Sequence, residues 1–513
     1  MHKIYTAAGA KQTDEHTIKI IGIPSLVLME RAAAGVTKRV LDVLKEDNKQ
    51  QVICICGKGN NGADGLAVAR QLSERGADVS VYLCNTIKKS AGDSDDIKSD
   101  FDIQLNICLN IGLKFLKSLS IPTGAVVVDS VFGNGLDREV GGIYKDVIAK
   151  INKSGAYVIA TDIPSGINAT TGRVMGSAVR ADETVTFGTE RTGHILYPGA
   201  EYTGRLTVEN IGWQTAGLKE NDISYYLLDE DDLKLIPGRK ANSHKGSFGS
   251  ALLIAGSKEY GGAPILSAGA AFVSGVGLVR VYTHKKNRAP LLSRVPEAIV
   301  SSYGMSDFEP ESLEESTEKL KKLIVGAGAI GAGPGIGKSL AAEEILKCVF
   351  ENVTCPLILD ADALNLIADG RITLPAGKCS DLIITPHLKE AARLLKCDVG
   401  EVEADLPGTA LKLHKKFNAG VILKSAVTVI TDGKEIFINK GGNSGMACAG
   451  SGDVLTGLLC GLAAQGLKGA ELMCAGVYLH SAAGECAKRK LGEAGMLPSD
   501  IAKSVRDVLK STR

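Results

Sequence analysis

Short apolar runs alternate with amphipathic helical patterns over most of the chain. In the N-terminal half, the apolar run 51–56 is followed by a glycine-rich segment at 57–65, a helical pattern at 66–75 and a second apolar run at 78–84. The order of strand, glycine loop, helix and strand is typical of a doubly wound α/β unit. Such a unit places a ligand site at the loop behind its first strand.

Two further apolar runs of this half end in an aspartate. Asp129 is followed by glycines at 133 and 135, and Asp162 is followed by Ile-Pro-Ser-Gly. Ligands bind at the carboxyl ends of strands in open parallel sheets. A single aspartate of this kind is usually a turn or cap residue, but three loops that converge on one edge favour a binding site.

The glycine-rich segment matches the pattern GxGxxG, which is weak evidence by itself. A standard NAD-dependent dehydrogenase also needs an acidic residue at the end of the second strand, and this chain has Cys84-Asn85-Thr86 there. Such a dehydrogenase is therefore disfavoured. The side-chain oxygens of Asn60, Asn61 and Asp64 instead suit a cation or a ribose.

The C-terminal half begins behind the polar stretch 215–222 and shows the same alternation. Its predicted strands each run into a glycine turn or a polar side chain, and they are 251–255, 323–325, 357–360, 382–385 and a strand–turn–strand unit over 421–430. We expect a mostly parallel sheet with helices on both faces. Both halves are therefore predicted to be doubly wound α/β domains.

The stretch 443–457 carries the strongest local signal for chemistry. Small residues run up to Asp453, and an apolar helical pattern starts directly behind it. The amides of Gly450, Ser451 and Gly452 would form an anion site at the start of that helix. Asp453 then either accepts a proton beside a bound phosphate or merely caps the helix, and the local sequence leaves both hypotheses open.

Other polar residues at the predicted strand ends have two interpretations each. His387 follows Thr-Pro at a strand end, which favours ligand contact over a core histidine. Asp360 and Asp362 either face a ligand or only hold loops together. The segment 335–339 resembles a P-loop, but Ala332 stands where that pattern requires its first glycine, so the pattern fails.

Composition narrows the class of protein. The 513 residues predict two or three domains, and 44% hydrophobic with 23% charged residues is typical of a globular protein. A net charge of +1 gives no reason to expect nucleic acid or an anionic membrane as a partner. We find no signal peptide and no apolar run of about 20 residues, so we expect a cytoplasmic protein. The 12 cysteines lack metal-ligand spacing and are expected to be reduced.

Four motifs of the N-terminal half resemble the NAD(P)H-hydrate epimerase family, also called the YjeF N-terminal family. They are Met29-Glu30-Arg31-Ala32-Ala33, Asn60 to Gly65, Val128 to Gly133 and Asp162 to Asn168, and they occur in the family's order within residues 1–216. The resemblance implies a Rossmann-like fold that interconverts the R and S epimers of NAD(P)H hydrate. The chain departs from the family at Ala63, where glycine is usual.

The resemblance also implies roles for individual residues. Potassium would be bound by Asn61, Asp129 and Ser165, and Asp162 would be the catalytic acid or base. The expected hydrate contacts of the epimerase are Asn60, Asn61, Gly62, Ala63, Asp64, Gly133, Asn134, Gly135, Leu136, Asp137, Arg138, Glu139 and Asp162.

The C-terminal half resembles the NAD(P)H-hydrate dehydratase family, which has a ribokinase-like fold. The motifs are Lys245 to Gly249, Gly333 to Gly337, Leu359 to Asn365, Thr385-Pro-His387 and Asn443 to Asp453, and the match covers residues 225–513. The resemblance implies dehydration of the S hydrate to NAD(P)H at the expense of ADP or ATP, with Mg²⁺. The chain departs from the family at Leu388-Lys389, Ser425 and Cys448.

Residue roles follow from this resemblance too. Asp453 would be the catalytic base. The expected hydrate contacts of the dehydratase are Ala263, Gly335, His387 and Asp453. The expected nucleotide contacts are Lys424, Ser425, Ala426, Val427, Thr428, Asn443, Ser444, Gly445, Met446, Ala447, Cys448, Ala449, Gly450, Ser451 and Gly452.

The leading hypothesis is a bifunctional enzyme that repairs hydrated NADH and NADPH (NADHX and NADPHX) and acts as a homo-oligomer. One alternative is a ribokinase-type small-molecule kinase with a regulatory N-terminal half. Another treats the N-terminal half as a binding module without catalysis. The presence of Asp129, Asp162 and Ser165 argues against that last alternative.

Overall fold

The structure, a computed structural model, describes residues 1–46, 51–84, 99–218, 223–304, 313–374, 379 and 381–511. The chain forms two compact units, Lys3–Tyr225 and Tyr226–Arg513, and the second also includes Met1–His2. Asn85 and Thr86, which argued against a dehydrogenase, lie outside the described residues, as do positions 219–222 of the predicted linker.

The N-terminal unit is built on a seven-stranded parallel sheet with the order β4-β3-β2-β5-β6-β7-β8. Its strands are β2 (Gln51–Cys56), β3 (Asp78–Leu83), β4 (Lys114–Phe115), β5 (Val126–Ser130), β6 (Tyr157–Thr161), β7 (Glu183–Phe187) and β8 (Arg205–Glu209). Its helices are α1 (Ala7–Lys19), α2 (Ser25–Glu46), α3 (Asn60–Glu74), α4 (Asp100–Asn110), α5 (Gly142–Lys153), α6 (Thr192–Ile195) and α7 (Gly199–Thr203).

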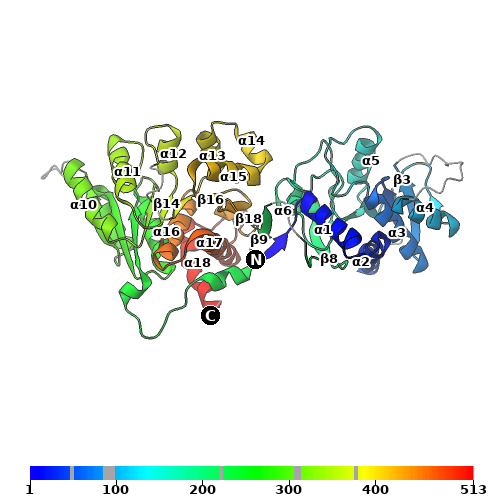
Figure 1. The fold of residues 1–513 in the computed structure, drawn as a ribbon, viewed down its shortest axis with the longest axis horizontal. Helices are drawn as coiled ribbons and strands as arrows, with labels where there is room; N and C mark the ends of the chain where they lie inside the picture. The colour runs from blue at the N-terminus through cyan, green and yellow to red at the C-terminus, as the bar shows by residue number, and fades with distance from the viewer. Residues whose placement is uncertain are drawn as a thin grey trace. The chain divides into compact units, whose positions relative to one another are not determined.

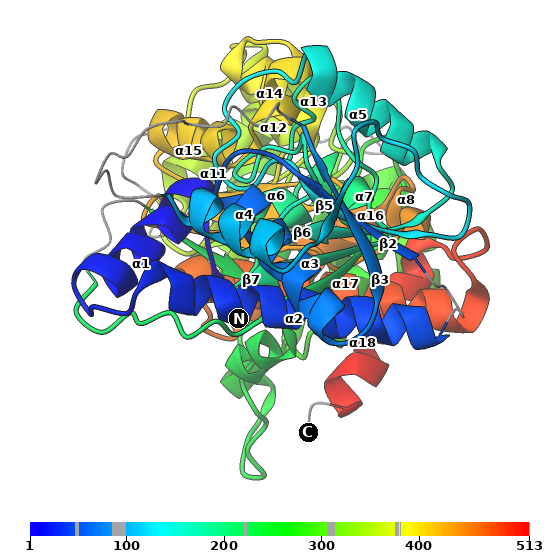
Figure 2. The ribbon, with the colours of Figure 1, turned by 90° about the vertical axis from the view of Figure 1, so that its right-hand side faces the viewer.

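Alternate side chains of β2 enter two different hydrophobic clusters, which explains why this strand is apolar from Val52 to Cys56. Val52, Cys54 and Cys56 pack with α2, α3 and α4, and these helices lie side by side (Figure 2). Ile53 and Ile55 pack with α5 on the opposite face. A parallel strand covered on both faces has no polar side to display. The predicted doubly wound fold is confirmed for this unit.

The helix predicted at 66–75 starts earlier than expected. α3 begins at Asn60, so most of the predicted loop forms the helix's first turns. The glycines that suggested a loop serve close packing instead: a Cβ at Gly62 would lie 2.0 Å from the carbonyl oxygen of Gly57, and one at Gly65 would lie 2.5 Å from Cβ of Ser130. The Gly62 contact allows the short crossing from β2 to α3, and the Gly65 contact allows α3 to pack closely on β5.

The C-terminal unit has a sheet with the order β9-β18-β17-β16-β15-β14-β13-β10-β11-β12, and β1 (His2–Ile4) lies beside β9. Its strands are β9 (Ser224–Leu227), β10 (Ser250–Ile254), β11 (Leu278–His284), β12 (Ile299–Tyr303), β13 (Ala329–Ala332), β14 (Leu357–Leu359), β15 (Leu382–Ile384), β16 (Gly420–Leu423), β17 (Thr428–Thr431) and β18 (Glu435–Asn439). Its helices are α8 (Gly262–Val273), α9 (Arg288–Arg294), α10 (Leu313–Val325), α11 (Leu340–Asn352), α12 (Asp362–Ala368), α13 (Leu388–Leu395), α14 (Val399–Ala404), α15 (Leu406–Phe417), α16 (Ser451–Ala464), α17 (Gly469–Leu491) and α18 (Pro498–Ser511).

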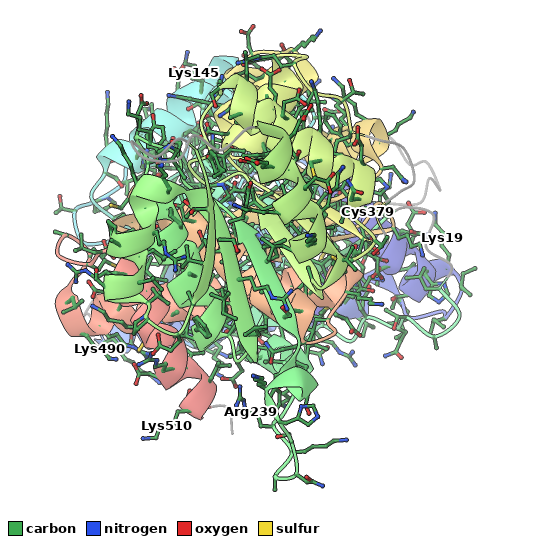
Figure 3. All side chains as sticks on the ribbon, turned by 90° about the vertical axis from the view of Figure 1, so that its left-hand side faces the viewer. Lys19, Lys145, Arg239, Cys379, Lys490 and Lys510 are labelled. Carbon is green, nitrogen blue, oxygen red and sulfur yellow. The ribbon has the colours of Figure 1, made fainter. Side chains whose placement is uncertain are left out.

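Helices cover both faces of this sheet, as predicted. The helices α8, α16, α17 and α18 share one hydrophobic cluster with the strands, and α10 to α15 lie on the other face (Figure 1). The strands from β16 to β12 pair in parallel, and β17 and β18 continue the sheet antiparallel. In Figure 3 the green strands are seen between helices, and the exposed Lys490 and Lys510 lie on α17 and α18.

The strand predicted at 323–325 is wrong, because these residues form the last turn of α10. Leu320 and Ile324 are buried four residues apart, whereas Val325 is 85% exposed, and this spacing is that of a helix face. The actual strand, β13, has the small residues Ala-Ile-Gly-Ala. A Cβ at Gly331 would lie 3.0 Å from Leu253, so close packing rather than apolar bulk defines this strand.

No described helix is both long and apolar enough to cross a membrane.

Candidate active sites

Polar side chains from three segments meet at the carboxyl end of β5. The Oγ of Ser165 donates to Asp129 Oδ1 at 2.6 Å, and the Ser165 amide donates to Oδ2 at 2.8 Å. Asn61 Nδ2 donates to the carbonyl of Phe132 at 3.0 Å, and the Phe132 amide donates to Ser165 Oγ at 2.8 Å. The structure therefore brings together the three residues expected to bind potassium.

Two features of this cluster favour a bound cation. Asn61 Oδ1 is buried and has no hydrogen-bond partner within the part of the chain that the structure describes, although a buried acceptor normally has one. Burial raises the pKa of Asp129 to about 6 despite its hydrogen bonds from Ser165 and Val131. A cation among these oxygens would satisfy the amide oxygen and favour the ionised carboxylate. Oxygens of this kind suit a hard ion, and no cluster of three His, Cys, Asp or Glu side chains at metal-binding distance occurs among the described residues.

Asp162 lies directly behind β6 and is held by one donor from β7 and two from the segment that follows it. Its Oδ1 accepts hydrogen bonds from Thr186 Oγ1 at 3.0 Å and Arg191 Nη2 at 3.1 Å. Its carbonyl oxygen accepts one from His194 Nε2 at 2.9 Å. The backbone of Asp162 has a φ of +66°, a left-handed conformation that is costly for a residue with a side chain.

Arg191 and His194 were not among the predicted site residues. The rule that ligands bind at the carboxyl ends of parallel strands does point to the segment after β7, but neither residue belongs to a motif we recognised. Asp64, on α3, completes the acidic side of this site. Burial first, and then the nearby Asp162 and Asp14 carboxylates, raise the pKa of Asp64 well above its ordinary value.

The remaining predicted epimerase contacts divide into accessible and buried residues. Asn134 Oδ1 accepts a hydrogen bond from Arg191 Nε at 3.1 Å, which joins its loop to Asp162. The buried ones that have a side chain are Ala63, which packs among α2, α3 and β2, and Leu136, which packs in the cluster with α5. The exposed ones are Asn60, Gly135, Asp137, Arg138 and Glu139, and Gly62 is buried while Gly133 is half-buried. The side chains of Ala63 and Leu136 therefore contribute to the core and do not face the loop surface.

In the C-terminal unit, Asp453 is the third residue of α16. The helix starts behind Gly450, which has a φ of +105°, and it has no side-chain capping hydrogen bond. Among the described residues, no hydrogen bond to the Asp453 carboxylate is found. Burial raises the pKa of Asp453 to about 7, and the neighbouring Asp360 adds to the effect while Lys424 opposes it. Asp453 is therefore available to exchange a proton near neutral pH.

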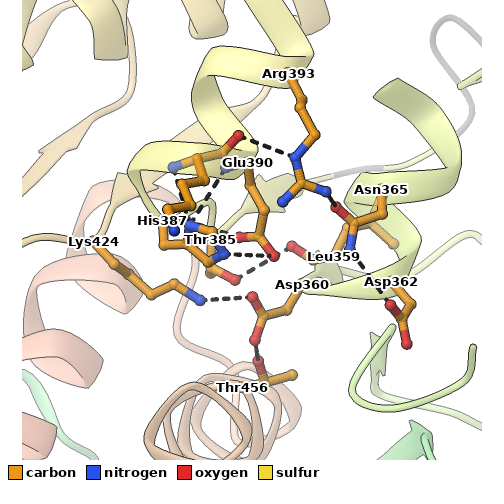
Figure 4. A network of polar contacts seen from close by, with 11 residues as sticks. Leu359, Asp360, Asp362, Asn365, Thr385, His387, Glu390, Arg393, Lys424 and Thr456 are labelled. Carbon is orange, nitrogen blue, oxygen red and sulfur yellow. Dashed lines mark hydrogen bonds and ion pairs between the residues drawn. The ribbon is translucent and has the colours of Figure 1, made fainter. Parts of the chain in front are cut away.

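An ion pair between a half-buried lysine and a buried aspartate lies beside the start of this helix (Figure 4). Lys424 Nζ donates to Asp360 Oδ1 at 2.7 Å, and Thr456 Oγ1 donates to Asp360 Oδ2 at 2.8 Å. Although burial opposes it, Lys424 lowers the pKa of Asp360. A Cβ on Gly452 would lie 3.2 Å from Lys424 Nζ, so this glycine allows the ammonium to approach the helix start. Asp360 thus joins β14, β16 and α16.

His387 has a structural role that the sequence did not reveal. Its Nδ1 accepts hydrogen bonds from the amides of Lys389 and Glu390, so it caps α13, and the His387 amide in turn donates to Glu390 Oε2 (Figure 4). Burial and the nearby Lys424 lower the pKa of His387 to about 4. A neutral ring whose Nδ1 accepts carries its proton on Nε2. This Nε2 lies 3.5 Å from Glu390 Oε1, which is long for a hydrogen bond, and the side chain is 46% exposed, so the proton is accessible to a ligand at neutral pH.

The structure also brings Gly335 next to Ala263. A Cβ on Gly335, which has a φ of +60°, would lie 3.0 Å from Cβ of Ala263. Asp362 Oδ2 accepts a hydrogen bond from the Gly337 amide at 2.9 Å and so fixes this glycine turn. Asp360 and Asp362 both hold loops together, which is one of the two roles considered for them.

The two predicted nucleotide segments occupy turns next to the ion pair. Lys424 to Thr428 connect β16 to β17, and Ser425 and Ala426 are exposed there while Val427 is buried. In the second segment Asn443 Oδ1 accepts from the Gly445 amide, and Ser451 Oγ donates to the Met446 carbonyl. The exposed residues of that segment are Ser444, Ala447, Cys448 and Ala449. Both turns therefore present accessible backbone.

Comparison with known proteins identifies the family. The family described as NAD(P)H-hydrate dehydratase matches residues 251–507, and the family described as YjeF-related protein N-terminus matches residues 25–193. A bifunctional NAD(P)H-hydrate repair enzyme of Thermofilum pendens is 35% identical over 534 residues, which cover 100% of this chain and 97% of the relative. The chain belongs to the bifunctional NAD(P)H-hydrate repair enzymes.

Other relatives of this family agree. The bifunctional repair enzyme of Escherichia coli is 32% identical over 99% of this chain and 94% of its own length. An ADP/ATP-dependent NAD(P)H-hydrate dehydratase from Bacillus subtilis, co-crystallized with ATP/Mg²⁺, is 26% identical with a TM-score of 0.50, and the match covers 57% of this chain and all of that one. A ribokinase-like superfamily protein from Enterococcus faecalis is 33% identical with a TM-score of 0.50 and covers 56% of this chain and 96% of that one. The ribokinase-like fold of the C-terminal unit is thereby confirmed.

Proposed function

We propose that this chain repairs hydrated NADH and NADPH in two reactions. The N-terminal domain, at 1–216, interconverts the R and S hydrates, and the C-terminal domain, at 225–513, dehydrates the S hydrate at the expense of ADP or ATP. Family membership over the full length supports this function over a small-molecule kinase. The observation that carries the dehydration is Asp453, a carboxyl of pKa about 7 at the N-terminus of α16.

The dehydration follows from the geometry around α16. The amides at the helix start hold the phosphate that is being transferred, and Lys424 adds positive charge beside them. Asp453 accepts the proton of the hydrate hydroxyl as the hydroxyl oxygen attacks the terminal phosphorus of the nucleotide. The bond from that phosphorus to the nucleotide breaks, and AMP leaves from ADP, or ADP from ATP. Departure of that phosphate, with loss of a proton from the neighbouring ring carbon, restores the double bond of the dihydronicotinamide. Positioning and charge stabilisation carry most of such a transfer.

Two metal ions belong to the proposal. Mg²⁺ neutralises phosphate charge when it is bound with the nucleotide. Potassium fits the oxygens of Asn61, Asp129 and Ser165, because the orphaned Oδ1 of Asn61 lies among them. In the epimerase, Asp162 exchanges a proton with the hydrate. Cytoplasmic location, a homo-oligomeric state and the absence of a nucleic-acid partner stay predictions.

The function is tested with the purified chain and synthetic NADPH hydrate. With Mg²⁺ and ADP or ATP, we expect the near-ultraviolet absorbance of NADPH to return, and without nucleotide we expect the R and S hydrates to interconvert on a chromatogram. No absorbance with either nucleotide contradicts the dehydratase. Accumulation of a stable phosphorylated product would instead indicate a kinase.

A further inference from the structure

Arg191 is a cation whose guanidinium group is buried away from solvent. Its side chain is 1% exposed, and it forms an ion pair of 3.1 Å with Asp162. Burial lowers the pKa of Arg191, but a guanidinium stays charged in proteins. A buried charge is retained only where partners compensate its desolvation. The cost of burying Arg191 is therefore offset mainly at Asp162.

The donors of Arg191 are divided between the carboxylate and its surroundings. Nη2 binds Asp162, Nε binds Asn134 on the loop that follows β5, and Nη1 binds the carbonyls of Phe187 and Thr189. The guanidinium carbon lies 5.1 Å from the centre of the Trp213 ring. Because a guanidinium is a rigid plane, these contacts fix the position of Nη2.

His194 holds the backbone of the same aspartate. Its Nδ1 accepts the Arg191 amide proton at 3.0 Å, so its Nε2 carries the proton that is donated to the Asp162 carbonyl. Burial lowers the pKa of His194 to about 4, and the ring is neutral at physiological pH. The neutral ring thus stabilises the left-handed backbone of Asp162.

Both side-chain donors of Asp162 converge on one oxygen. Thr186 and Arg191 bind Oδ1, and no hydrogen bond to Oδ2 is found among the described residues. The carboxylate is 10% exposed. The arrangement leaves Oδ2 as the carboxylate oxygen available for proton exchange, and the contacts to Oδ1 fix its orientation.

We propose that Arg191 is the positioning residue of the epimerase, a role that rests on the proposed function: it orients Asp162 and couples it to the substrate loop through Asn134. Arg191 does not touch the reacting atoms in this role. It determines where Oδ2 lies relative to the hydrate, and it sets the loop that contacts the hydrate. Loss of the Asp162 contact lowers kcat, whereas loss of the Asn134 contact raises KM.

The experiment compares Arg191→Met, Arg191→Lys and the control Arg180→Met in the full chain. Arg180 is an exposed arginine of the same domain and stacks on Tyr202 at 4.2 Å. Epimerisation is followed without nucleotide, so that dehydration is silent. We expect Arg191→Met to lower the epimerase kcat by about 100-fold. In Arg191→Lys we expect about tenfold recovery of kcat and an increased KM, because an ammonium pairs with Asp162 but lacks the fork that reaches Asn134.

A double-mutant cycle separates positioning from general stability. In an Asp162→Asn chain, Arg191→Met should lower kcat by less than about threefold further, because the residue it positions is already lost. If Arg191→Met does not fold, the kcat and KM of Arg191→Lys decide. The inference is overturned if Arg191→Met folds and keeps the kcat and KM of the parent chain. It is also overturned if the folded fraction of Arg191→Lys keeps both values. An inactive parent chain overturns the proposed epimerase and this inference with it, whereas an active parent chain beside an active Arg191→Met overturns the inference alone.

Discussion

The two candidate catalytic carboxylates, Asp162 and Asp453, are held in opposite ways. Asp162 lies at a strand end and receives hydrogen bonds at its side chain and its backbone. Asp453 lies in the first turn of a helix, and among the described residues no donor reaches its carboxylate. The first is oriented by the protein before substrate arrives, and the second is left for the ligand to engage.

The difference matches the chemistry proposed for each domain. Epimerisation brings no charged co-substrate, so the protein itself must fix the proton acceptor. Dehydration brings a nucleotide phosphate to the helix start, where Lys424 and the amides supply the positive charge. Burial and Asp360 raise the pKa of Asp453 to about 7, so that it is partly protonated before the phosphate binds. A group with a pKa near the working pH is suited to accept a proton and release it again.

The largest effects are expected when each of the two carboxylates is neutralised in turn, which tests whether they serve separate reactions. We expect Asp453→Asn to lower dehydration by about 10³-fold and Asp162→Asn to lower epimerisation by about 10³-fold, each with less than a threefold effect on the other reaction. Both activities are measured on the same preparation. Loss of both activities in either variant would show that the sites are not independent.

The next largest effect is expected at the ion pair beside Asp453. Lys424→Met leaves Asp360, which is 2% exposed, without its cation. We expect a loss of about 3 kcal/mol in the free energy of unfolding of the C-terminal domain and a fall of about 100-fold in dehydration. Lys338→Met is the matched control, because its pair with Asp369 is about 40% exposed on both sides and should contribute less than about 1 kcal/mol. Equal effects of the two variants would contradict the role of Lys424.

The free Asp453 carboxylate should also make stability depend on pH. Its pKa is raised to about 7 in the folded protein, so the folded state binds the proton more tightly than the unfolded chain, whose aspartates titrate near 3.8. The contribution of the Asp453 proton to the stability of the folded state is therefore fully present below about pH 4. It is lost as the pH rises from there through about 7. Asp453→Asn removes this dependence. We expect the variant to be about 2 kcal/mol more stable than the parent at pH 8, after allowance for partial exposure, and no more stable at pH 4.

Denaturant unfolding at the two pH values checks this prediction. Because the two domains can unfold separately, the transition assigned to the C-terminal domain is compared in parent and variant. If the stability difference between parent and variant is the same at pH 4 and pH 8, the pKa of Asp453 is not raised by its surroundings in the folded protein.

Much of both folds followed from sequence because strands buried on both faces are apolar throughout. This is why β2, β14 and the pair β16–β17 were located correctly, whereas β13 was missed. Its Ala-Ile-Gly-Ala sequence carries little apolar bulk, and the apolar end of α10 took its place in the prediction. A pattern of apolar residues predicts a strand only where the side chains are large. It misses strands such as β13, whose small residues pack closely against their neighbours.

The positions of the candidate site carboxylates were also predictable from the pattern of apolar strands and helices, but their partners were not. Asp129, Asp162 and Asp453 follow recognisable strands or precede a recognisable helix, so their positions could be inferred. The partners of the site carboxylates come from segments distant in sequence. Arg191 is 29 residues from Asp162, and Thr456 is 96 residues from Asp360, the neighbour of Asp453. Such pairing depends on the order of strands in the sheet, which the pattern of one chain does not contain.

Ala63 offers the smallest and most selective test of how the epimerase site is built. The resemblance to the epimerase family leads us to expect glycine here, close to Asn61 and Asp64, yet the Ala63 methyl is fully buried among α2, α3 and β2. We expect Ala63→Gly to lower the free energy of unfolding of the N-terminal domain by about 2 kcal/mol, through helix propensity and the lost methyl. Ala34→Gly, at an exposed position of α2, should cost about 1 kcal/mol, through propensity alone. Epimerase activity should stay within about twofold in both variants, because the methyl packs into the core and the catalytic carboxylate is fixed independently by Arg191. A large gain in epimerase kcat/KM for Ala63→Gly, without loss of stability, would instead show that this methyl constrains the substrate loop.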